Sequence, residues 1–459
     1  MSIRQICKNL RTKGFKETYR IHRVHKCEEG LYGYATNRPY GNLPLEKRHK
    51  ALEKTVKWEQ TLEELDPKKY KKFKKWLKPH YLKEVIPQRY AELVQKCDVK
   101  NKVVFMEKYG PNSPPNNYIS KVLREDGKYE VVKIGLDKNH NSDFGIFENV
   151  VHLVEEMADA KAICISSANQ YLSHVEIRPE TKFIQLWHGC GCFKKVGYST
   201  LDSNDFGRSE KNLKEYEQYH NYSYVCLPAE DQKWVFEDAM RIPRDSGKLV
   251  PVGVSRTDQF YDPEYSKAAR EKLEEKFPQI AGKKIIFYAP TYRGRISQAY
   301  TPNQLDVAAM GAALSDEYVL LIKYHSFGCK TRPALPEEYA NSFAFDMNAN
   351  GILDIESLLA ISDILITDYS SVGFEFAILE RPIVFFAYDK DQYLDERGMY
   401  YDYEEITPGP ICTETEEIIS YVESLKDGFD DAEIKKFKEQ YVKMCDGHAT
   451  ERTIALFDE

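Results

Sequence analysis

Side chains suited to proton transfer and phosphate binding directly follow short apolar segments of this sequence. His188 follows one such segment and precedes a glycine, and His325 follows another in the second half of the chain. A histidine can accept a proton from an attacking hydroxyl or stabilise charge on a phosphate. Arg293, after a third segment, has the fork geometry that suits phosphate oxygens. The alternative for each residue is structural: a histidine that shapes a loop, or an arginine paired with an acidic side chain.

The most informative stretch is Asp363–Gly398. Its order is a strand at Ile364–Thr367, a polar turn at Asp368–Ser371, a helix at Val372–Leu379 and a second strand at Ile383–Phe386. The turn places the hydroxyls of Ser370 and Ser371 and several backbone N–H groups at a helix N-terminus, where anions bind well. A phosphate or diphosphate ligand is therefore the first hypothesis. A βαβ unit whose serine only caps the helix is the alternative.

Two further side chains of this stretch could contact the same ligand. Glu375 lies one helical turn after Ser371. Its carboxylate could accept a ribose or polyol hydroxyl, or simply orient the turn. Arg397, near the end of the stretch, could contact either a diphosphate or an acceptor.

Cys190 and Cys192 lie beside His188 and raise the question of a zinc site. Their H-x-C-x-C spacing is not a standard structural zinc pattern, and no second cysteine pair follows it. Loop cysteines without a special role fit better. Nothing in the sequence resembles a dedicated metal site, so we expect neither a metal nor another cofactor, although a divalent-ion requirement for turnover stays open.

Apolar segments alternate with helical patterns from Lys102 onward, which is typical of parallel, doubly wound sheets. The first series of candidate strands is Val103–Glu107, Tyr129–Ile134, Ala162–Ser166, Phe183–Trp187, Tyr224–Leu227 and Leu249–Val252, and the second is Ile285–Ala289, Tyr318–Lys323, Phe343–Phe345, Ile364–Thr367 and Ile383–Phe386. We therefore expect an α/β fold with two Rossmann-like domains that face a cleft. Ligands bind beyond the carboxyl ends of such strands, so the residues that follow the strands predict a shared site in that cleft.

The same pattern divides the chain into four parts. We expect a mostly helical segment over residues 1–98, with residues 19–44 irregular. An acceptor-side domain follows over 99–265, and a ligand-binding domain over 266–430. The final part, 431–459, is expected to be one helix that could cross back onto the first domain.

The charge of the chain is distributed unevenly. Residues 1–98 carry 24 Lys and Arg against 12 Asp and Glu, whereas the remaining residues carry 41 against 60. A basic segment on an acidic body predicts an anionic surface as the partner of that segment. We expect no nucleic-acid partner, because the acidic body would repel nucleic acid and no nucleic-acid-binding signature is present.

The basic segment is densest at Lys68–Lys83, KKYKKFKKWLKPHYLK. Tyr70, Phe73 and Leu77 fall on one helical face with lysines around them, and Trp76 borders this stripe. Aromatic anchors with a collar of lysines suit the surface of an anionic membrane. The alternative is a solvated helix whose aromatic side chains pack on the protein body.

The sequence predicts a location at the cytoplasmic face of the membrane. No run approaches the roughly 20 apolar residues that span a bilayer, and the N-terminus lacks the apolar core of a signal peptide. Ten cysteines without a framework spacing fit reduced thiols. We therefore expect a cytosolic protein that binds the membrane peripherally.

Five segments resemble motifs of the CDP-glycerol glycerophosphotransferases, the family of teichoic-acid primases and poly(glycerol phosphate) or poly(ribitol phosphate) polymerases. They are FIQLWHGCGCFKKVG, KLVPVGVSRTDQFYD, IIFYAPTYRG, LLIKYHS and LITDYSSVGFEFAILERPIVFFAYDKDQYLDERGMYYDYEEITPGPI. The resemblance runs in order from about Val103 to Ile411 and leaves out residues 1–98. Departures after Gly189 and after Gly253 alter loops on the acceptor side more than the expected chemistry.

The resemblance implies a GT-B architecture whose second domain holds most of a CDP-alditol, either CDP-glycerol or CDP-ribitol. It implies transfer of the alditol phosphate to a hydroxyl of a membrane-anchored acceptor, lipid-linked or polymeric, with release of CMP. This reaction would serve the synthesis of teichoic acid or a related cell-surface polymer.

The resemblance also implies roles for individual residues at matching positions. His188 is the expected general base, although its role and that of His325 could be exchanged. The expected ligands of the diphosphate and the leaving CMP are His325, Arg293, Ser370 and Ser371, and the expected donor-site residues are Thr291, Asp368 and Glu375. Arg397 is expected to bind substrate.

Two other classes of function are compatible with the residues. A GT-B glycosyltransferase or epimerase that uses a nucleotide sugar would share phosphate sites at strand ends. A non-catalytic peripheral membrane protein could bind an anionic polymer through the basic segment. Turnover of UDP-sugars would favour the first, and polymer binding without turnover the second.

Overall fold

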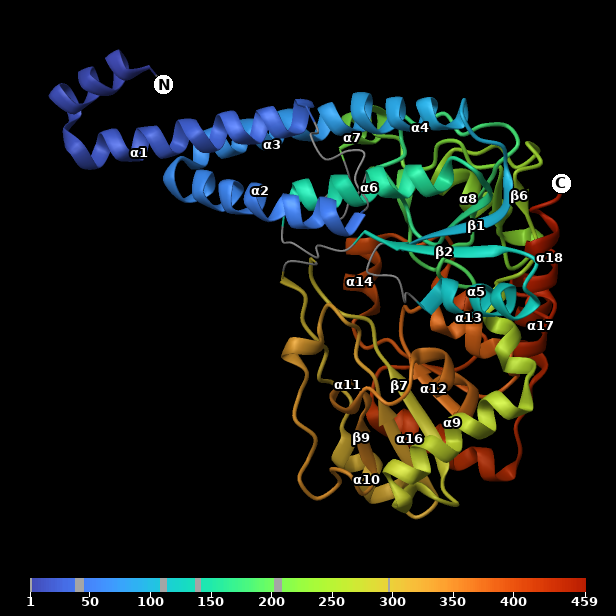
Figure 1. Ribbon diagram of the computed structural model, residues 1–459. Helices are drawn as coiled ribbons and strands as arrows, with labels where there is room; N and C mark the ends of the chain where they lie inside the picture. Colours follow the sequence, from blue (N-terminus) through green and yellow to red (C-terminus); the bar gives the residue numbers. More distant parts are fainter. Residues whose placement is uncertain (1, 38–44, 108–113, 137–141, 202–208, 296–297) are drawn as a thin grey trace. The chain divides into compact units, whose positions relative to one another are not determined.

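The protein is described by a computed structural model that covers residues 2–37, 45–107, 114–136, 142–201, 209–295 and 298–459 (Figure 1). The chain forms two compact units. Unit 1 comprises residues 1–183 and 216–221, and unit 2 comprises residues 184–215 and 222–459.

Unit 1 begins with helices that lie side by side and continues into parallel strands (Figure 1). Its helices are α1 (Ile3–Asn37), α2 (Leu45–Leu65), α3 (Pro67–His80), the π-helix η1 (Tyr81–Val85), α4 (Ile86–Val94), α5 (Pro114–Asp126) and α6 (Asp143–Met157), and its strands are β1 (Lys100–Glu107), β2 (Glu130–Gly135) and β3 (Ala160–Ile165). Strand β1 pairs in parallel with β2 and with β3.

Helix α1 corrects one expectation. Residues 19–37 are helical rather than irregular, and residues 38–44 lie outside the described part of the chain. The reason is visible in the spacing of Val24, Cys27, Leu31 and Ala35, which are all buried. This spacing of three or four residues forms one apolar helical face, and tertiary packing of that face outweighs the local content of Gly and Asn.

Helix α3 has the predicted lysine collar, but its apolar stripe faces the interior of unit 1. Phe73 and Leu77 have no exposed surface. The Phe73 ring lies 5.1 Å from the ring of Tyr32, and the Trp76 ring stacks on His80 at 4.6 Å. The prediction that Phe73 anchors the helix in a membrane is therefore wrong, because this side chain belongs to the core, whereas most of the lysines stay exposed.

The described residues form two six-stranded sheets, and the strand pairs for which a register is known are parallel. The first has the order β2-β1-β3-β4-β5-β6, and the boundary between the units falls within β4 (Lys182–Gln185). The second sheet, in unit 2, has the order β12-β11-β10-β7-β8-β9. The further strands are β5 (Tyr224–Cys226), β6 (Leu249–Val250), β7 (Lys284–Ala289), β8 (Tyr318–Ile322), β9 (Ala344–Asp346), β10 (Ile364–Thr367), β11 (Ile383–Phe386) and β12 (Ile411–Cys412). All eleven predicted strands are present, with bounds that differ by at most three residues, and β12 was not predicted.

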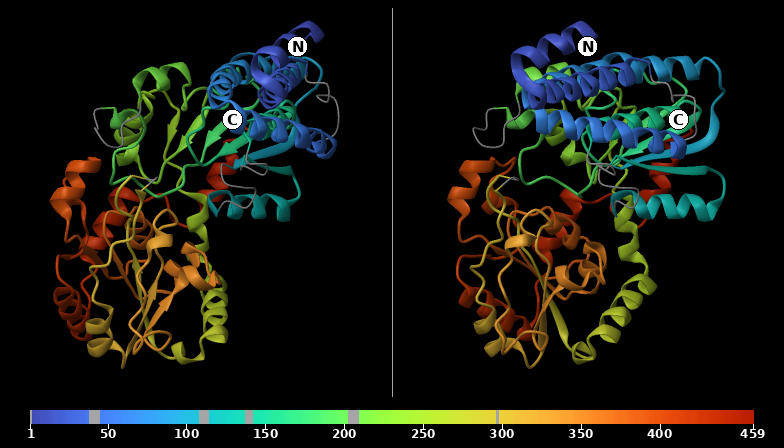
Figure 2. Two further views of the ribbon diagram at one scale, coloured as in Figure 1. Left: turned by 90° about the vertical axis from the view of Figure 1, so that its left-hand side faces the viewer. Right: turned by 60° about the vertical axis from the view of Figure 1, so that its left-hand side comes forward.

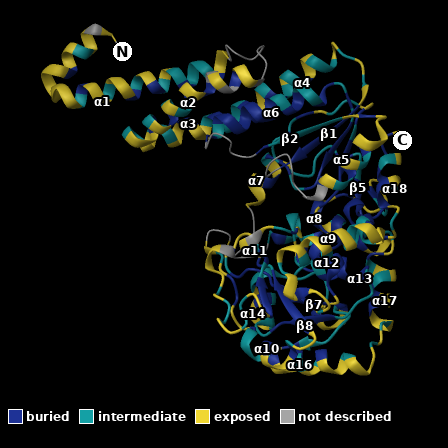
Figure 3. Cartoon of the chain, turned by 60° about the horizontal axis from the view of Figure 1, so that its bottom comes forward, coloured by how far each residue is buried: buried dark blue, intermediate teal, exposed yellow. Residues whose placement is uncertain are grey.

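Helices cover both faces of the second sheet (Figure 2). On one face α9, α12, α13 and α17 pack in a single apolar core, and on the other α10 and α16 do. Figure 3 shows β7 and β8 buried between helices with exposed outer faces.

The helices of unit 2 are α7 (Glu210–Glu215), α8 (Lys233–Met240), α9 (Pro263–Lys276), α10 (Val307–Leu314), α11 (Met347–Asn350), α12 (Ile355–Ile361), α13 (Val372–Ala377), α14 (Lys390–Arg397), α15 (Tyr403–Ile406), α16 (Thr415–Ser424), α17 (Ala432–Tyr441) and α18 (Ala449–Ala455). Its 3₁₀ helices are η2 (Gly197–Thr200), η3 (Glu230–Gln232), η4 (Ser255–Tyr261), η5 (Pro278–Ile280), η7 (Cys329–Thr331) and η8 (Leu425–Asp427).

The end of the chain differs from the single helix that the sequence predicts. Helices α17 and α18 are separated by a break that contains Gly447, whose φ of 91° favours glycine. Helix α18 then packs on η4, and both carboxylate oxygens of Asp258 accept N–H groups at its start, from Ala449 at 3.0 Å and Thr450 at 2.7 Å. Among the described residues, no helix is both long enough and apolar enough to cross a membrane.

Candidate active site

Parallel pairing in the second sheet brings the predicted phosphate-binding segments together. Thr367 at the end of β10 is opposite Ala289 of β7, and Tyr288 is opposite Ile322 of β8. The residues that follow these strands therefore leave the sheet at one edge, as ligand sites of doubly wound sheets require.

Asp368 organises this edge. Its side chain is buried and accepts the backbone N–H groups of Thr291, at 2.9 Å, and of Tyr369, at 2.7 Å. It also pairs with Nη1 of Arg293 at 3.0 Å. Asp368 and Thr291 thus fix the polar turn to the loop after β7, and their role in shaping a donor site stays a prediction.

Arg293 is buried and engaged within the protein. Asp389 accepts from its Nε at 2.6 Å and its Nη2 at 3.0 Å, and the Thr291 carbonyl accepts from Nη1 at 2.7 Å. Its contacts match the structural alternative, an arginine paired with acidic side chains, although it is buried rather than at the surface. Direct contact with phosphate stays a prediction for Arg293.

His325 follows β8 and lies within an aromatic group. Its ring centroid is 4.8 Å from that of Tyr292, whose hydroxyl accepts from Nη2 of Arg397 at 2.7 Å. The surrounding protein, with the cations Lys194 and Arg397, lowers the pKa of His325 to about 4. The imidazole is therefore neutral near pH 7. The Tyr292 side chain thus connects His325 with Arg397, and their predicted contacts with substrate stay predictions.

Lys194 is a site residue that the sequence reasoning passed over. The segment 193–195 runs antiparallel to 398–400: the N–H of Lys195 donates to the Gly398 carbonyl at 3.1 Å, and that of Tyr400 to the Phe193 carbonyl at 2.9 Å. Burial and, to a smaller extent, the cation of Arg397 lower the pKa of Lys194 to about 8. The signal for this residue was the Lys-Lys pair after a strand end.

The loop that carries His188 approaches the polar turn closely. A cavity of about 90 Å³, here called the Lys194 pocket, is lined by His188, Lys194 and Ser371, with the loop between the first two. A Cβ atom on Gly189 would lie only 3.2 Å from Oγ of Ser371. The predicted base and one predicted phosphate ligand therefore share a small cavity, and a glycine permits their approach.

Trp187, directly before His188, has a left-handed backbone with φ of 59°. Such a conformation costs energy in a residue with a side chain and is found more often at functional sites. Here it turns the chain so that the Trp187 ring is buried while His188 is exposed. The backbone N–H of Trp187 donates to Oε1 of Gln185 at 2.9 Å, which secures the turn.

Arg256, also passed over by the sequence reasoning, ties this loop to two helices. Its guanidinium is buried between Glu356 of α12, at 2.7 Å, and Glu375 of α13. The same side chain donates to the His188 carbonyl at 3.1 Å. Arg256 thereby holds the backbone of the candidate base.

Glu375 is buried in this ion-pair network. Its Oε1 also accepts the Cys190 N–H at 3.3 Å, so it orients the loop that carries His188. Burial raises the pKa of Glu375, and Arg256 opposes that shift. A contact with a ribose or polyol stays a prediction.

The region that carries these contacts has relatives of known family. Residues 90–457 match the family model described as CDP-Glycerol:Poly(glycerophosphate) glycerophosphotransferase. The chain belongs to this glycerophosphotransferase family.

The relatives of this glycerophosphotransferase family member are teichoic-acid primases and polymerases. It is 31% identical over 332 residues to the teichoic acid poly(ribitol-phosphate) polymerase of Bacillus spizizenii, covering 70% of this chain and 52% of the relative. It is 35% identical to the ribitol-phosphate primase of the same organism (60% and 69% covered) and 31% identical to the glycerol-phosphate primase of Bacillus subtilis (68% and 77%). The chain thus spans about half the length of the polymerase.

Solved structures of the wall teichoic acid polymerase TagF share the fold of this glycerophosphotransferase family member. One has a TM-score of 0.64 at 22% identity and covers 81% of this chain and 93% of that one. Another, soaked with CDPG, has a TM-score of 0.63 at 24% identity and covers 80% and 91%. These likenesses support the α/β fold with two parallel sheets.

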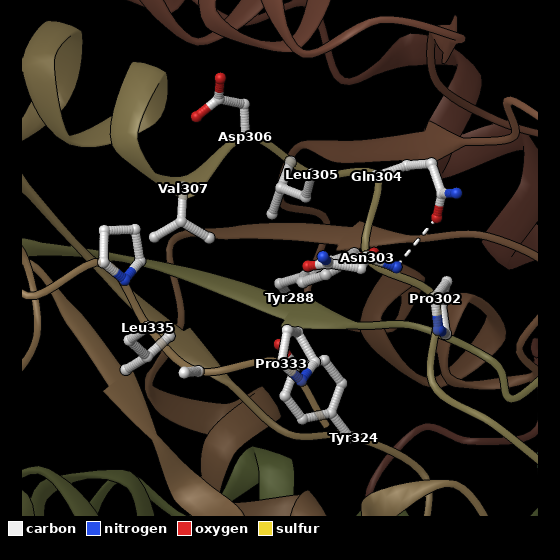
Figure 4. A pocket seen from close by; sticks show the side chains of 12 residues that line it. Tyr288, Pro302, Asn303, Gln304, Leu305, Asp306, Val307, Tyr324, Pro333 and Leu335 are labelled. Carbon is white, nitrogen blue, oxygen red and sulfur yellow. Dashed lines mark hydrogen bonds between the residues drawn. The ribbon is translucent and has the colours of Figure 1, made fainter. Parts of the chain in front are cut away.

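A second cavity, of about 350 Å³, lies beside the ends of β7 and β8 (Figure 4). Tyr288, Tyr324 and several prolines line it, and its acidic residue Asp306 caps α10 by accepting two N–H groups. The described residues that line it include no lysine, arginine or histidine. A phosphate would therefore meet more positive charge in the Lys194 pocket than in the cavity of Figure 4.

Proposed function

We propose that this protein transfers glycerol phosphate or ribitol phosphate from the corresponding CDP-alditol to a hydroxyl of an acceptor, with release of CMP. The observation that carries the proposal is the Lys194 pocket. It joins a histidine, a lysine and a serine beside the carboxyl ends of parallel strands, in a chain of the glycerophosphotransferase family.

In the proposed reaction, an acceptor oxygen attacks the phosphorus that bears the alditol. A new P–O bond forms to the acceptor, the P–O bond to CMP breaks, and CMP leaves with the bonding electrons. His188 takes the proton of the acceptor hydroxyl. The exposure of His188 to solvent is compatible with the approach of a large acceptor.

The charge that develops on phosphate oxygens needs donors that are already in place. We assign this role to Ser370 and Ser371 at the start of α13, to Arg397, and to His325 as a neutral donor. Three further residues support the phosphate site indirectly, because they fix the turn from which the serines project. They are Arg293, Thr291 and Asp368. Glu375 positions the His188 loop and stays a candidate contact for the donor.

The acceptor is proposed to be lipid-linked or polymeric, and unit 1 supplies a surface that suits a membrane. Helix α3 exposes most of its lysines, and α1 exposes Phe15 (75%) and Tyr19 (56%) among basic residues. Apolar rings within a basic surface bind anionic membrane interfaces. We propose peripheral binding at the cytoplasmic face through this surface.

The arrangement of the parts is also a proposal. A GT-B arrangement, in which the Rossmann-like domains 99–265 and 266–430 face a cleft, would let the acceptor approach from the first domain and the donor from the second. The basic segment 1–98 would serve docking, and residues 431–459 would cross back onto the first domain.

A donor screen tests the proposed function. The purified chain is incubated with CDP-glycerol or CDP-ribitol and a lipid-linked acceptor, and CMP release and product length are measured. The His188→Ala variant should lower kcat by about 10²- to 10⁴-fold. The matched control is His448→Ala, at an exposed histidine on the surface. Turnover of UDP-sugars without turnover of either CDP-alditol would overturn the proposal, as would wild-type activity of His188→Ala.

A further inference from the structure

Backbone pairing fixes the segment that carries Lys194. Lys194 forms an isolated antiparallel bridge with Met399, and hydrogen bonds of its neighbours Phe193 and Lys195 flank that bridge. Phe193 is buried, and its ring lies 4.5 Å from that of Phe374 in α13. Lys195, by contrast, is exposed. The two lysines of one sequence pair therefore have different environments.

Two cations, Arg397 of α14 and Arg293 after β7, lie near the Lys194 ammonium. The neutral imidazole of His325 and the phenol groups of Tyr292 and Tyr393 are also near it. The carboxylate that faces it, Asp368, is already paired with Arg293 and with backbone N–H groups. Among the described residues, Lys194 forms no ion pair.

A lysine that forms no ion pair, in a cavity near the cation of Arg397, is suited to a ligand that carries negative charge. We propose that Lys194 is a direct ligand of the diphosphate of a nucleoside diphosphate, acting from the same pocket as Ser371 and His188. The inference rests on the proposed function for the identity of the donor. The diphosphate itself is recognised by charge and geometry, which do not depend on what is transferred.

The protonation behaviour of Lys194 supports this role and gives it a signature. Because the pKa of Lys194 is lowered to about 8, the free protein begins to lose this charge just above neutral pH. The anion binds the ammonium form, so affinity should be nearly full at pH 7 and should fall as the pH rises through about 8. His325, with a pKa of about 4, does not change its charge in this range.

The first test measures CDP binding by titration calorimetry at pH 7. Lys194→Met should weaken CDP binding by about 10- to 100-fold, as expected for a charge-assisted contact. Lys194→Arg should stay within about threefold of wild type, since it keeps the charge. Lys195→Met is the matched control, one residue away and exposed, and should bind CDP normally. Thermal unfolding of each variant checks the fold.

The second test follows CDP affinity from pH 7 to pH 9.5. The wild-type affinity should fall above about pH 8, whereas Lys194→Arg should remove that fall, because a guanidinium stays protonated. CDP binding by a folded Lys194→Met variant that equals wild type would overturn the inference. So would an unchanged pH profile in Lys194→Arg, or an equal loss of affinity in Lys195→Met.

These binding measurements need neither acceptor nor turnover. Lys194-dependent CDP binding without any CDP-alditol turnover would contradict the proposed function while the inference stands. Turnover of a CDP-alditol that is unaffected by Lys194→Met, in kcat and in KM, would contradict the inference while the proposed function stands.

Discussion

Helix α3 and the Lys194 pocket both concentrate positive charge, but they do so in opposite environments. Five of the α3 lysines are exposed, and one of those, Lys74, pairs with Asp143 of unit 1, while the partly exposed Lys69 pairs with Glu28. Water screens such charges, and exposed ion pairs contribute little to stability. Lys194 lies against other cations in a small cavity, where its pKa is lowered.

The comparison shows that the density of charge along the sequence and the strength of charge at a site are different properties. The lysine-rich stretch of α3 is conspicuous in the sequence, yet its helix is held by an apolar stripe. The cations of the pocket come from separate segments, after β4 and β7 and at the end of α14. Burial gives each of these isolated charges a larger effect than that of an exposed lysine.

Removal of a buried cation should have the largest effect on the free energy of unfolding. Arg293→Met leaves the buried carboxylate of Asp368 and the partly buried one of Asp389 without their partner. We expect the free energy of unfolding to fall by about 3–5 kcal/mol. Lys72→Met on α3 is the control and should stay within about 0.5 kcal/mol. Equal effects of the two variants in urea unfolding would break the comparison.

Truncation of the apolar stripe of α3 should have the next largest effect on the free energy of unfolding. Phe73→Ala removes a fully buried ring that contacts Tyr32 and Phe144, and should lower the free energy of unfolding by about 3 kcal/mol. Binding to anionic liposomes should persist in the folded fraction. Loss of liposome binding with unchanged stability would instead restore a membrane role for Phe73.

The sequence predicted the second sheet well because its strands are short apolar runs that are buried on both faces. Thr291, Asp368 and His325 follow strands β7, β10 and β8, so the rule that ligands bind beyond strand ends singled them out, whereas Arg397 was proposed only because it closes the stretch Asp363–Gly398. Arg256 and Asp389 could not be predicted in this way, since their roles depend on which segments pack together. The orientation of Phe73 was also missed, because an amphipathic stripe looks the same whether protein or lipid covers it.

The pKa of His325 reports directly on the charge of Lys194 in the pocket. Lys194 helps to hold the pKa of His325 at about 4 by disfavouring a second cation. In Lys194→Met the pKa of His325 should therefore rise from about 4 toward its ordinary 6.5. Two-dimensional NMR of labelled imidazoles would measure it, with His325→Gln for assignment. An unchanged pKa would mean that Lys194 does not contribute to the field at His325.

The smallest change in free energy is expected when single exposed lysines are replaced. Lys72 and Lys75 lie on α3 and face solvent. A lysine near an anionic bilayer contributes about 1 kcal/mol, so Lys72→Gln with Lys75→Gln should weaken binding to phosphatidylserine vesicles by about 5-fold per lysine. The loss should shrink at high salt, because the attraction is screened.

The same two changes at Lys272 and Lys276 of α9, which are also exposed, provide the control. They remove equal charge from unit 2 and should leave vesicle binding nearly unchanged if the membrane surface belongs to unit 1. A loss of the same size in both variants would show that vesicles respond to net charge alone. Helix α3 would then be a solvated structural helix, and the acceptor would have to reach His188 without its help.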